Sequence, residues 1–172
     1  IIKAGAGTDA ITASIADTTA VINIKPLVTG VETITLDVTD GHANDNLVTL
    51  DLTEVTGATA INLNLAADVT TKLNAVGSEA VTIKTGGATS VSTVAYTGLS
   101  TATDGGADAK TISLSTIDLV TLTVAGVETL TMNVSGTAGD LDALAVDALE
   151  SLVITGGVLD ATSTTETFAL GT

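Results

Sequence analysis

Cysteine, tryptophan and arginine are absent from this 172-residue chain, and phenylalanine, tyrosine, methionine, proline and histidine occur once each. Without cysteine the chain is indifferent to the redox state of its compartment, which permits secretion without requiring it. Without arginine, no bidentate clamp for a phosphate or a substrate carboxylate can form. His42 is the single histidine, so a histidine-rich metal site is excluded and a Ser-His-Asp triad could use only that residue.

Positive charge is scarce, because 20 acidic residues stand against 5 lysines and the net charge is −15. Nucleic acids and anionic membranes both require a basic surface, so we exclude them as partners. Beyond Ile1-Ile2 there is no long apolar run, and we expect no direct insertion into a membrane. No signal peptide is visible, and the chain starts at Ile1 instead of Met, so we expect a processed form or an excerpt of a longer protein.

The short motifs of common enzymes are missing too: there is no G-x-S-x-G, no H-E-x-x-H and no P-loop. Paired carboxylates on a parallel β-helix could in principle cleave glycosides. Such a cleft normally also carries aromatic or cationic side chains that hold the sugar, and these are nearly lacking here. We therefore expect a protein that is not an enzyme.

What the chain does contain is aliphatic and repetitive. Apolar residues make up 45% of it, and with so few aromatics the core must be filled by Val, Ile, Leu and Ala. Such uniform side chains suit a narrow interior built from identical layers. Strand-forming Thr, Val and Ile are abundant, and Gly, Asp and Asn loops punctuate the sequence every 8 to 12 residues, which indicates an all-β fold.

Residues 119–157 carry the clearest internal repeat. A shift of 22 positions places apolar residues on apolar residues and Glu128 on Glu150, and fixed shifts of this size are typical of repeat architectures. A second echo joins Gly30-Val-Glu-Thr to Gly126-Val-Glu-Thr, 96 residues apart. The pairs related by the 22-residue shift are Leu119 and Leu141, Leu122 and Leu144, Val124 and Val146, Leu130 and Leu152, and Met132 and Ile154.

From these patterns we predict one module over residues 1–172, a parallel β-solenoid (β-helix) with rungs of about 22 residues. A β-sandwich is the alternative, although Asp40-Gly41 and Asp104-Gly105 lie in loops longer than a hairpin turn. Residues 140–149 are ambiguous, because their apolar residues also fit a short helix. The 22-residue register favours a strand there.

Three acidic loops resemble the calcium-binding nonapeptide G-G-x-G-x-D-x-U-x, in which glycine carbonyls and an Asp carboxylate bind Ca²⁺. Residues 4–12 fit this frame with the first glycine replaced, residues 40–48 fit it less closely, and residues 104–108 form a related loop. The alternative is that these are ordinary turns, in which Gly, Asn and Asp are also favoured. The candidate metal ligands are Gly5, Gly7, Asp9, Asp40, Gly41, Asn44, Asp45, Asp104 and Asp108.

Glu32, Glu128 and Glu150 share one place in the repeated frame. They could form a row of carboxylates that binds a ligand, or they could mark rung corners where Glu caps a turn or faces solvent. We favour the second interpretation. Short Thr-x-Thr pairs such as Thr33/Thr35 and Thr129/Thr131 also align, and we expect them on an exposed strand face.

The segments Gly30-Val-Glu-Thr-Ile-Thr-Leu and Gly126-Val-Glu-Thr-Leu-Thr-Met resemble recurring segments of Gram-negative surface-layer (S-layer) proteins of the Caulobacter type. These are RTX-related β-solenoid proteins exported by type I secretion. The resemblance implies an extracellular, Ca²⁺-dependent structural protein that assembles with copies of itself into a lattice on the cell surface. It also implies a cell-surface polysaccharide as a further partner. The alternative function is an adhesin segment, or an ice- or sugar-binding β-solenoid segment of an extracellular RTX-type protein.

Overall fold

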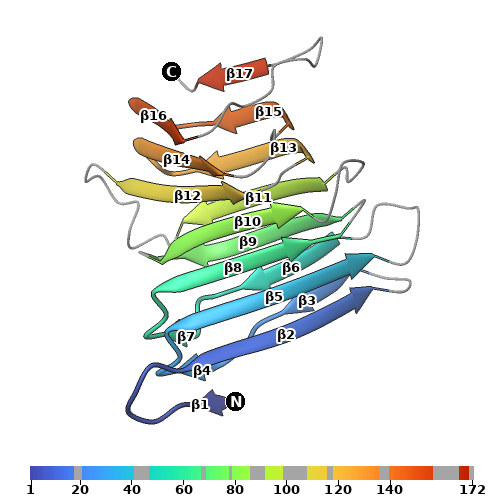
Figure 1. Cartoon of the computed structure of the whole chain (residues 1–172), viewed down its shortest axis with the longest axis vertical. Coiled ribbons are helices and arrows are strands. Elements are labelled where there is room, and N and C mark those ends of the chain that lie inside the picture. Colours follow the sequence, from blue (N-terminus) through green and yellow to red (C-terminus); the bar gives the residue numbers. More distant parts are fainter. Residues whose placement is uncertain are drawn as a thin grey trace.

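The computed structural model is a β-solenoid, in which every paired strand runs parallel to its neighbour (Figure 1). We use the word rung for one turn, which contains about 23 residues. The predicted solenoid is therefore confirmed, with rungs close to the expected length, and the β-sandwich is wrong because its sheets would pair antiparallel strands. The structure describes residues 1–17, 21–40, 47–66, 69–77, 79–85, 92–98, 108–115, 118–135, 140–156 and 167–170.

Two large sheets and one small sheet make up the stack. Each large sheet has seven strands, with orders β16-β14-β12-β10-β8-β5-β2 and β17-β15-β13-β11-β9-β6-β3, and the small sheet has the order β1-β4-β7. The strands are β1 (Ile2–Lys3), β2 (Ala10–Asp17), β3 (Ile22–Ile24), β4 (Val28–Thr29), β5 (Thr33–Asp40), β6 (Leu47–Asp51), β7 (Val55–Thr56), β8 (Ala60–Leu65), β9 (Thr70–Val76), β10 (Ala80–Thr85), β11 (Ser92–Gly98), β12 (Ala109–Ser115), β13 (Asp118–Ala125), β14 (Thr129–Ser135), β15 (Asp140–Val146), β16 (Ser151–Gly156) and β17 (Thr167–Leu170).

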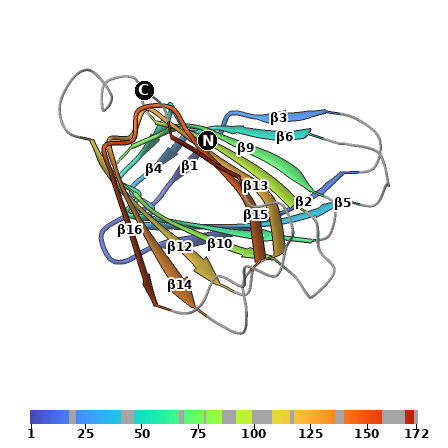
Figure 2. The same cartoon turned by 90° about the horizontal axis from the view of Figure 1, so that it is seen from above.

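The core is a set of aliphatic columns that run along the stack axis between the two large sheets. Because side chains alternate between the faces of a strand, every second residue points inward. One column contains Ile34, Ile61, Val81, Ile112 and Met132, all of them buried. Viewed along the axis, the large sheets form two sides of the cross-section, and β1 and β4 lie on a third (Figure 2).

The third side is present only in the first rungs. From Ile11 to its neighbour Ile34 the chain advances 23 residues, and from Ile34 to Ile61 it advances 27. From Ile61 to Val81 the step is only 20 residues, and no third-sheet strand is found after β7 in the described part of the chain. In the described residues, the 20-residue rung from Ile61 to Val81 thus has two sides instead of three.

The 22-residue repeat has the predicted register. Strand β13 pairs with β15 so that Leu119 meets Leu141 and Val124 meets Val146, and β14 pairs with β16 so that Met132 meets Ile154. Residues 140–146 form strand β15, so a helix there is excluded. Helical spacing misled because Leu141 and Leu144 are both buried across a step of three residues. The same step of three residues is present in β13, where Leu119 and Leu122 pair with Leu141 and Leu144.

The two Gly-Val-Glu-Thr segments stack two residues out of phase. Aligned by sequence, Ile34 falls on Leu130. In the sheet, the register connects Ile34 to Met132 instead. A shift of two keeps inward side chains inward, since the strand period is two. The shift arises between β10 and β12, so we divide the solenoid into a lower block (residues 9–85) and an upper block (residues 108–156).

Candidate functional site

The strands of the first large sheet begin at a corner that the Gly-Val-Glu-Thr segments build. Gly30 and Gly126 both have φ of 69°, the left-handed region that favours glycine. After each glycine, the N–H groups of the Glu and the Thr donate to one carbonyl oxygen in the rung below. Glu32 and Thr33 donate to the carbonyl of Asp9 at 3.1 and 3.2 Å, and Glu128 and Thr129 donate to that of Asp108 at 3.1 and 2.9 Å.

At these two corners the Glu side chain also folds back toward the Asp. The N–H of Asp9 donates to Oε2 of Glu32 at 2.6 Å, and the N–H of Asp108 donates to Oε2 of Glu128 at 2.8 Å. Asp9 and Asp108 each begin a block, so neither N–H has an in-phase carbonyl acceptor in a described rung below. The Glu carboxylate supplies the missing acceptor.

Glu150 stacks on Glu128 but does not repeat this role. Its N–H donates to the carbonyl of Glu128 at 2.8 Å, and the N–H of Glu128 already donates to Asp108. No backbone donor is therefore left for the Glu150 carboxylate at this corner, and the residue is exposed. All three glutamates lie at corners, as the sequence indicates. A single row of three is nevertheless wrong, because the phase shift separates Glu32 from the other two.

Both aspartates carry an oxygen that the described fold does not satisfy. Oδ2 of Asp9 and Oδ2 of Asp108 are buried, and neither has a hydrogen-bond partner among the described residues. A buried carboxylate oxygen without a partner is costly. The carboxylate of Glu32 or Glu128 lies at the main-chain N–H of the same Asp. The carboxylate and carbonyl oxygens gathered at each corner are the ligand type that Ca²⁺ takes.

The number of ligands at each corner is smaller than Ca²⁺ requires. In the described ranges, no three acidic or histidine side chains come together that could hold a metal ion. Calcium takes roughly six to eight oxygens. Within the described ranges, each Asp–Glu corner therefore has fewer oxygens than a complete Ca²⁺ shell contains.

The predicted metal ligands lie at different places in the structure, and some lie outside the described residues. Asp9 and Asp108 lie at equivalent corners but are not brought together, since β5, β8 and β10 separate their strands. Gly5 and Gly7 lie at the bend before β2; a Cβ on either would contact nothing, and φ of Gly7 is 138°. The backbone of Asp40 ends β5. The remaining candidates lie outside the described residues: Gly41, Asn44, Asp45 and Asp104.

Lys110 of β12 lies at the junction between the lower and the upper block. Its side chain is 5% exposed and stands in an inward column beside Leu130. Nζ donates to the carbonyl oxygen of Gly77 at 2.9 Å and to that of Glu79. Burial lowers the pKa of Lys110 from 10.5 to about 8, and the charge of Glu79 opposes this shift. Lys110 is not among the residues predicted from the sequence, although the alternation Lys110-x-Ile112-x-Leu114 places it on the inward face.

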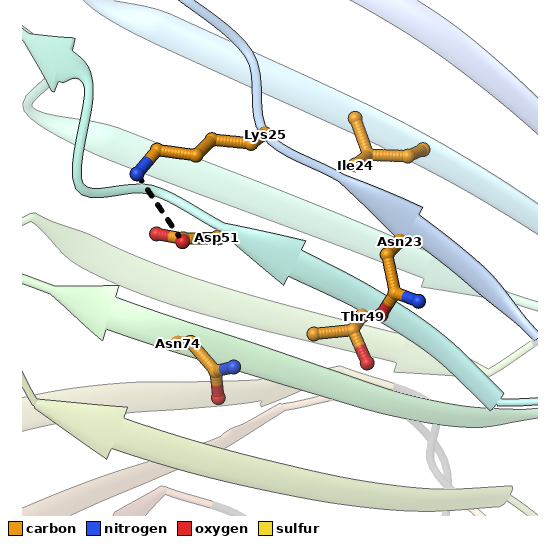
Figure 3. A pocket seen from close by; sticks show the side chains of 6 residues that line it. All are labelled: Asn23, Ile24, Lys25, Thr49, Asp51 and Asn74. Carbon is orange, nitrogen blue, oxygen red and sulfur yellow. Dashed lines mark ion pairs between the residues drawn. The ribbon is translucent and has the colours of Figure 1, made fainter.

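A polar groove of about 200 Å³ lies on the second large sheet (Figure 3). Lys25 crosses it, with Nζ 3.7 Å from Oδ2 of Asp51 and 3.9 Å from Oε1 of Glu54. The side-chain and backbone hydrogen bonds from Thr53, followed by the charge of Lys25, lower the pKa of Asp51 below its usual value of 3.8. The residues that line the groove are Asn23, Ile24, Lys25, Thr49, Asp51 and Asn74.

An apolar cavity of about 110 Å³ lies at the N-terminal end of the solenoid. Ile11, Ala13 and Ile15 of β2 line it together with core residues of the rungs above. Ile2 of β1 also lines the cavity, and within the described part of the chain β2 has a strand neighbour on one edge only.

No helix in the described residues is long and apolar enough to cross a lipid bilayer. Neither a protein-family model, nor a curated protein, nor a solved structure matches this chain.

Proposed function

We propose that this chain is a structural module of a secreted surface layer, which assembles with copies of itself on the cell surface in the presence of Ca²⁺. The observation that carries the proposal is the pair of open ends. At one end β2 and β3, and at the other β16 and β17, have a strand neighbour on one edge only among the described residues. Open strand edges and uncapped repeats favour addition of another chain.

The calcium part of the proposal is supported by the two corner sites. Asp9 and Asp108 each carry a buried carboxylate oxygen without a hydrogen-bond partner among the described residues, and the carboxylate of Glu32 or Glu128 accepts a hydrogen bond from the main-chain N–H of the same Asp. The chain carries a net charge of −15, so copies of it repel one another. A divalent cation at the corners neutralises charge locally and satisfies the buried oxygens. Further oxygens come from a neighbouring copy.

Secretion and the surface location rest on the Gly-Val-Glu-Thr resemblance together with the absence of cysteine. A cell-surface polysaccharide is the anchoring partner we expect, and the acidic surface is consistent with a partner bridged by Ca²⁺.

Calcium binding to the isolated chain tests the corner sites. Isothermal titration calorimetry with CaCl₂ should give binding that the substitution Asp108→Asn weakens. Glu150→Gln is the matched control, because Glu150 lies at the adjoining corner but is exposed. If both variants bind Ca²⁺ as the unsubstituted chain does, the Asp108–Glu128 corner is not a calcium site.

The alternative function is a sugar-binding or adhesin segment, and the groove of Figure 3 is the observation that favours it. Amide and hydroxyl groups of Asn23, Thr49 and Asn74 line the groove beside the Lys25–Asp51 ion pair. Such groups hydrogen-bond sugar hydroxyls. Binding of a defined glycan by a monomeric chain, lost on Asn74→Ala, would favour the alternative over self-assembly.

A further inference from the structure

Where the two blocks meet, the first strand of the upper block stacks on the last strand of the lower block. This junction is a contact between two solenoid ends within a single chain. Strand β12 begins the upper block at the Asp108–Glu128 corner and lies on β10, the last strand of the lower block in that sheet. The corner Asp and its Glu cap do not prevent stacking. Val81 pairs with Ile112 and Ile83 with Leu114 in a continuous parallel ladder.

The N-terminal end of the solenoid has the same construction. Strand β2 begins the lower block at the Asp9–Glu32 corner, as β12 begins the upper block. Residues 9–15 and 108–114 are identical at four of seven positions, the Asp, Ala, Thr and Ser of Asp-Ala-x-Thr-x-Ser-x. Strand β12 pairs on both edges, with β10 and β14, whereas β2 pairs only with β5 in the described structure. The free edge of β2 therefore has the sequence and the corner of a strand that stacks on a preceding rung.

The C-terminal end offers the matching surface. Ile154 of β16 continues the inward column of Ile112 and Met132, which are fully buried, yet Ile154 is 44% exposed. At the N-terminal end, Ile11, Ala13 and Ile15 of β2 line an apolar cavity, and in the described structure β2 has a strand neighbour on one edge only. Covering both surfaces removes apolar area from water, which is favourable.

The order of the strands also matches at the two ends. The chain alternates between the large sheets, its first large-sheet strand being β2 and its last being β17 in the other sheet. A second copy translated along the axis continues this alternation without a gap, placing its β2 beside β16 and its β3 beside β17. All strands then remain parallel, as they are within each sheet.

The charges of the two ends favour the same orientation, with a C-terminal end against an N-terminal end. Residues 1–30 contain two lysines and two aspartates and have no net charge, whereas residues 118–172 contain eight acidic residues and no lysine. Two C-terminal ends therefore repel each other, and a C-terminal end meets less repulsion at an N-terminal end. Two N-terminal ends would pair β2 with β2 in antiparallel fashion, which no described strand pair does.

We propose that the chain associates head to tail, the N-terminal end of one copy stacking on the C-terminal end of the next, with β2 paired to β16. This contact rests on the self-assembly proposed above and specifies its partner, a second copy, and its geometry, an axial stack.

Sedimentation velocity over a range of concentrations tests the contact with a matched pair of variants. Ile154→Lys puts a charge in the inward column at the C-terminal end. Val153→Lys puts the same charge on the adjacent residue, which is 43% exposed and points to the opposite face. Ile154→Lys should abolish the rise of the sedimentation coefficient with concentration, whereas Val153→Lys should leave it unchanged.

A mixing experiment fixes the polarity and guards against misfolded variants. Ala13→Glu blocks the N-terminal end and Ile154→Lys blocks the C-terminal end. Each variant alone should stay monomeric, and a 1:1 mixture should form dimers and nothing larger, because one competent end of each kind remains. Dimers of either variant alone would overturn the head-to-tail contact.

The outcomes separate this contact from self-assembly in general. Association that neither Ile154→Lys nor Ala13→Glu reduces would overturn the axial stack and leave a surface layer built through other contacts. A wild-type chain that stays monomeric at every concentration, with and without Ca²⁺, would overturn both the contact and the proposed function.

Discussion

The carboxylate of Glu128 accepts a hydrogen bond from the main-chain N–H of Asp108 at 2.8 Å, closing the corner at which the upper block begins. Glu32 and Asp9 repeat this relationship at 2.6 Å at the start of the lower block. The two Gly-Val-Glu-Thr segments thus recur 96 residues apart because each follows the start of a block. In both, the Glu side chain acts as a cap for the first corner N–H group.

We predict that Glu128→Ala destabilises the fold by about 1–3 kcal/mol, the usual cost of removing a charged partner from a buried N–H group. Glu150→Ala, at the next corner, should change the free energy of unfolding by less than about 0.5 kcal/mol, because Glu150 is exposed. Urea denaturation followed by circular dichroism measures both. Equal losses of stability in the two variants would show that the hydrogen bond between Glu128 and the N–H of Asp108 does not stabilise the fold.

Lys110 should make stability rise with pH in the alkaline range. Its pKa is about 8 in the folded chain and 10.5 for an unperturbed lysine, so between these values the unfolded chain binds more protons. Unfolding therefore becomes harder as pH increases, by at most about 1.4 kcal/mol per pH unit.

The substitution Lys110→Met should remove this rise, while Lys84→Met, at an exposed position of β10, should keep it. Urea midpoints measured from pH 7 to pH 10 check the slope. A slope that survives in Lys110→Met would assign the effect to another group.

The substitution Thr71→Val should stabilise the fold. Thr71 is fully buried in an inward column beside Val48, and within the described fold its hydroxyl has no hydrogen-bond partner. Valine has nearly the same shape, so Thr71→Val should raise the free energy of unfolding by about 1 kcal/mol. Thr49→Val, at a partly exposed position of the neighbouring strand β6, should change it little. A loss of stability in Thr71→Val would mean that the hydroxyl is satisfied.

The turn glycines should tolerate substitution according to their backbone angle. Gly126→Ala should cost about 1–2 kcal/mol, because φ of 69° brings a Cβ close to the following carbonyl oxygen. Gly5→Ala should be nearly neutral, since a Cβ there contacts nothing within 4 Å and its φ is not in the left-handed region. Thermal unfolding of the two variants side by side measures the difference. Equal costs would contradict the role of the left-handed turn.

Much of the fold follows from local patterns in the sequence. Alternation of aliphatic and polar residues placed Ile34, Leu36 and Val38 on one face, and all three are buried. The 22-residue shift gave the pairing of Leu130 with Leu152 and of Met132 with Ile154. These features were predictable because a strand has a period of two and a stacked repeat keeps its register.

The phase shift between the blocks could not be predicted in this way. It arises where β12 stacks on β10, whereas β8 and β10 still pair in the register of the lower block. Sequence alignment of Gly30 with Gly126 hides this shift, because a displacement of two leaves the inward and outward pattern unchanged. Lys110 was overlooked for a related reason: its alternation suits a buried position, but its charge suggests the surface.

The candidate site was predicted in part. Asp9 and Asp108 were identified from Gly/Asp loop patterns, and the structure places them at equivalent corners. Their partners Glu32 and Glu128 were assigned to corners but not to the aspartates, because the hydrogen bonds join residues 23 and 20 positions apart. Such contacts depend on rung length, which varies from corner to corner.

Electron microscopy of the purified 172-residue chain with Ca²⁺ and with EDTA is the most direct measurement of calcium-dependent self-assembly. With Ca²⁺ we predict filaments or a two-dimensional lattice, which EDTA dissolves into single particles. Monodisperse particles in both conditions, or an assembly that EDTA leaves intact, would contradict it.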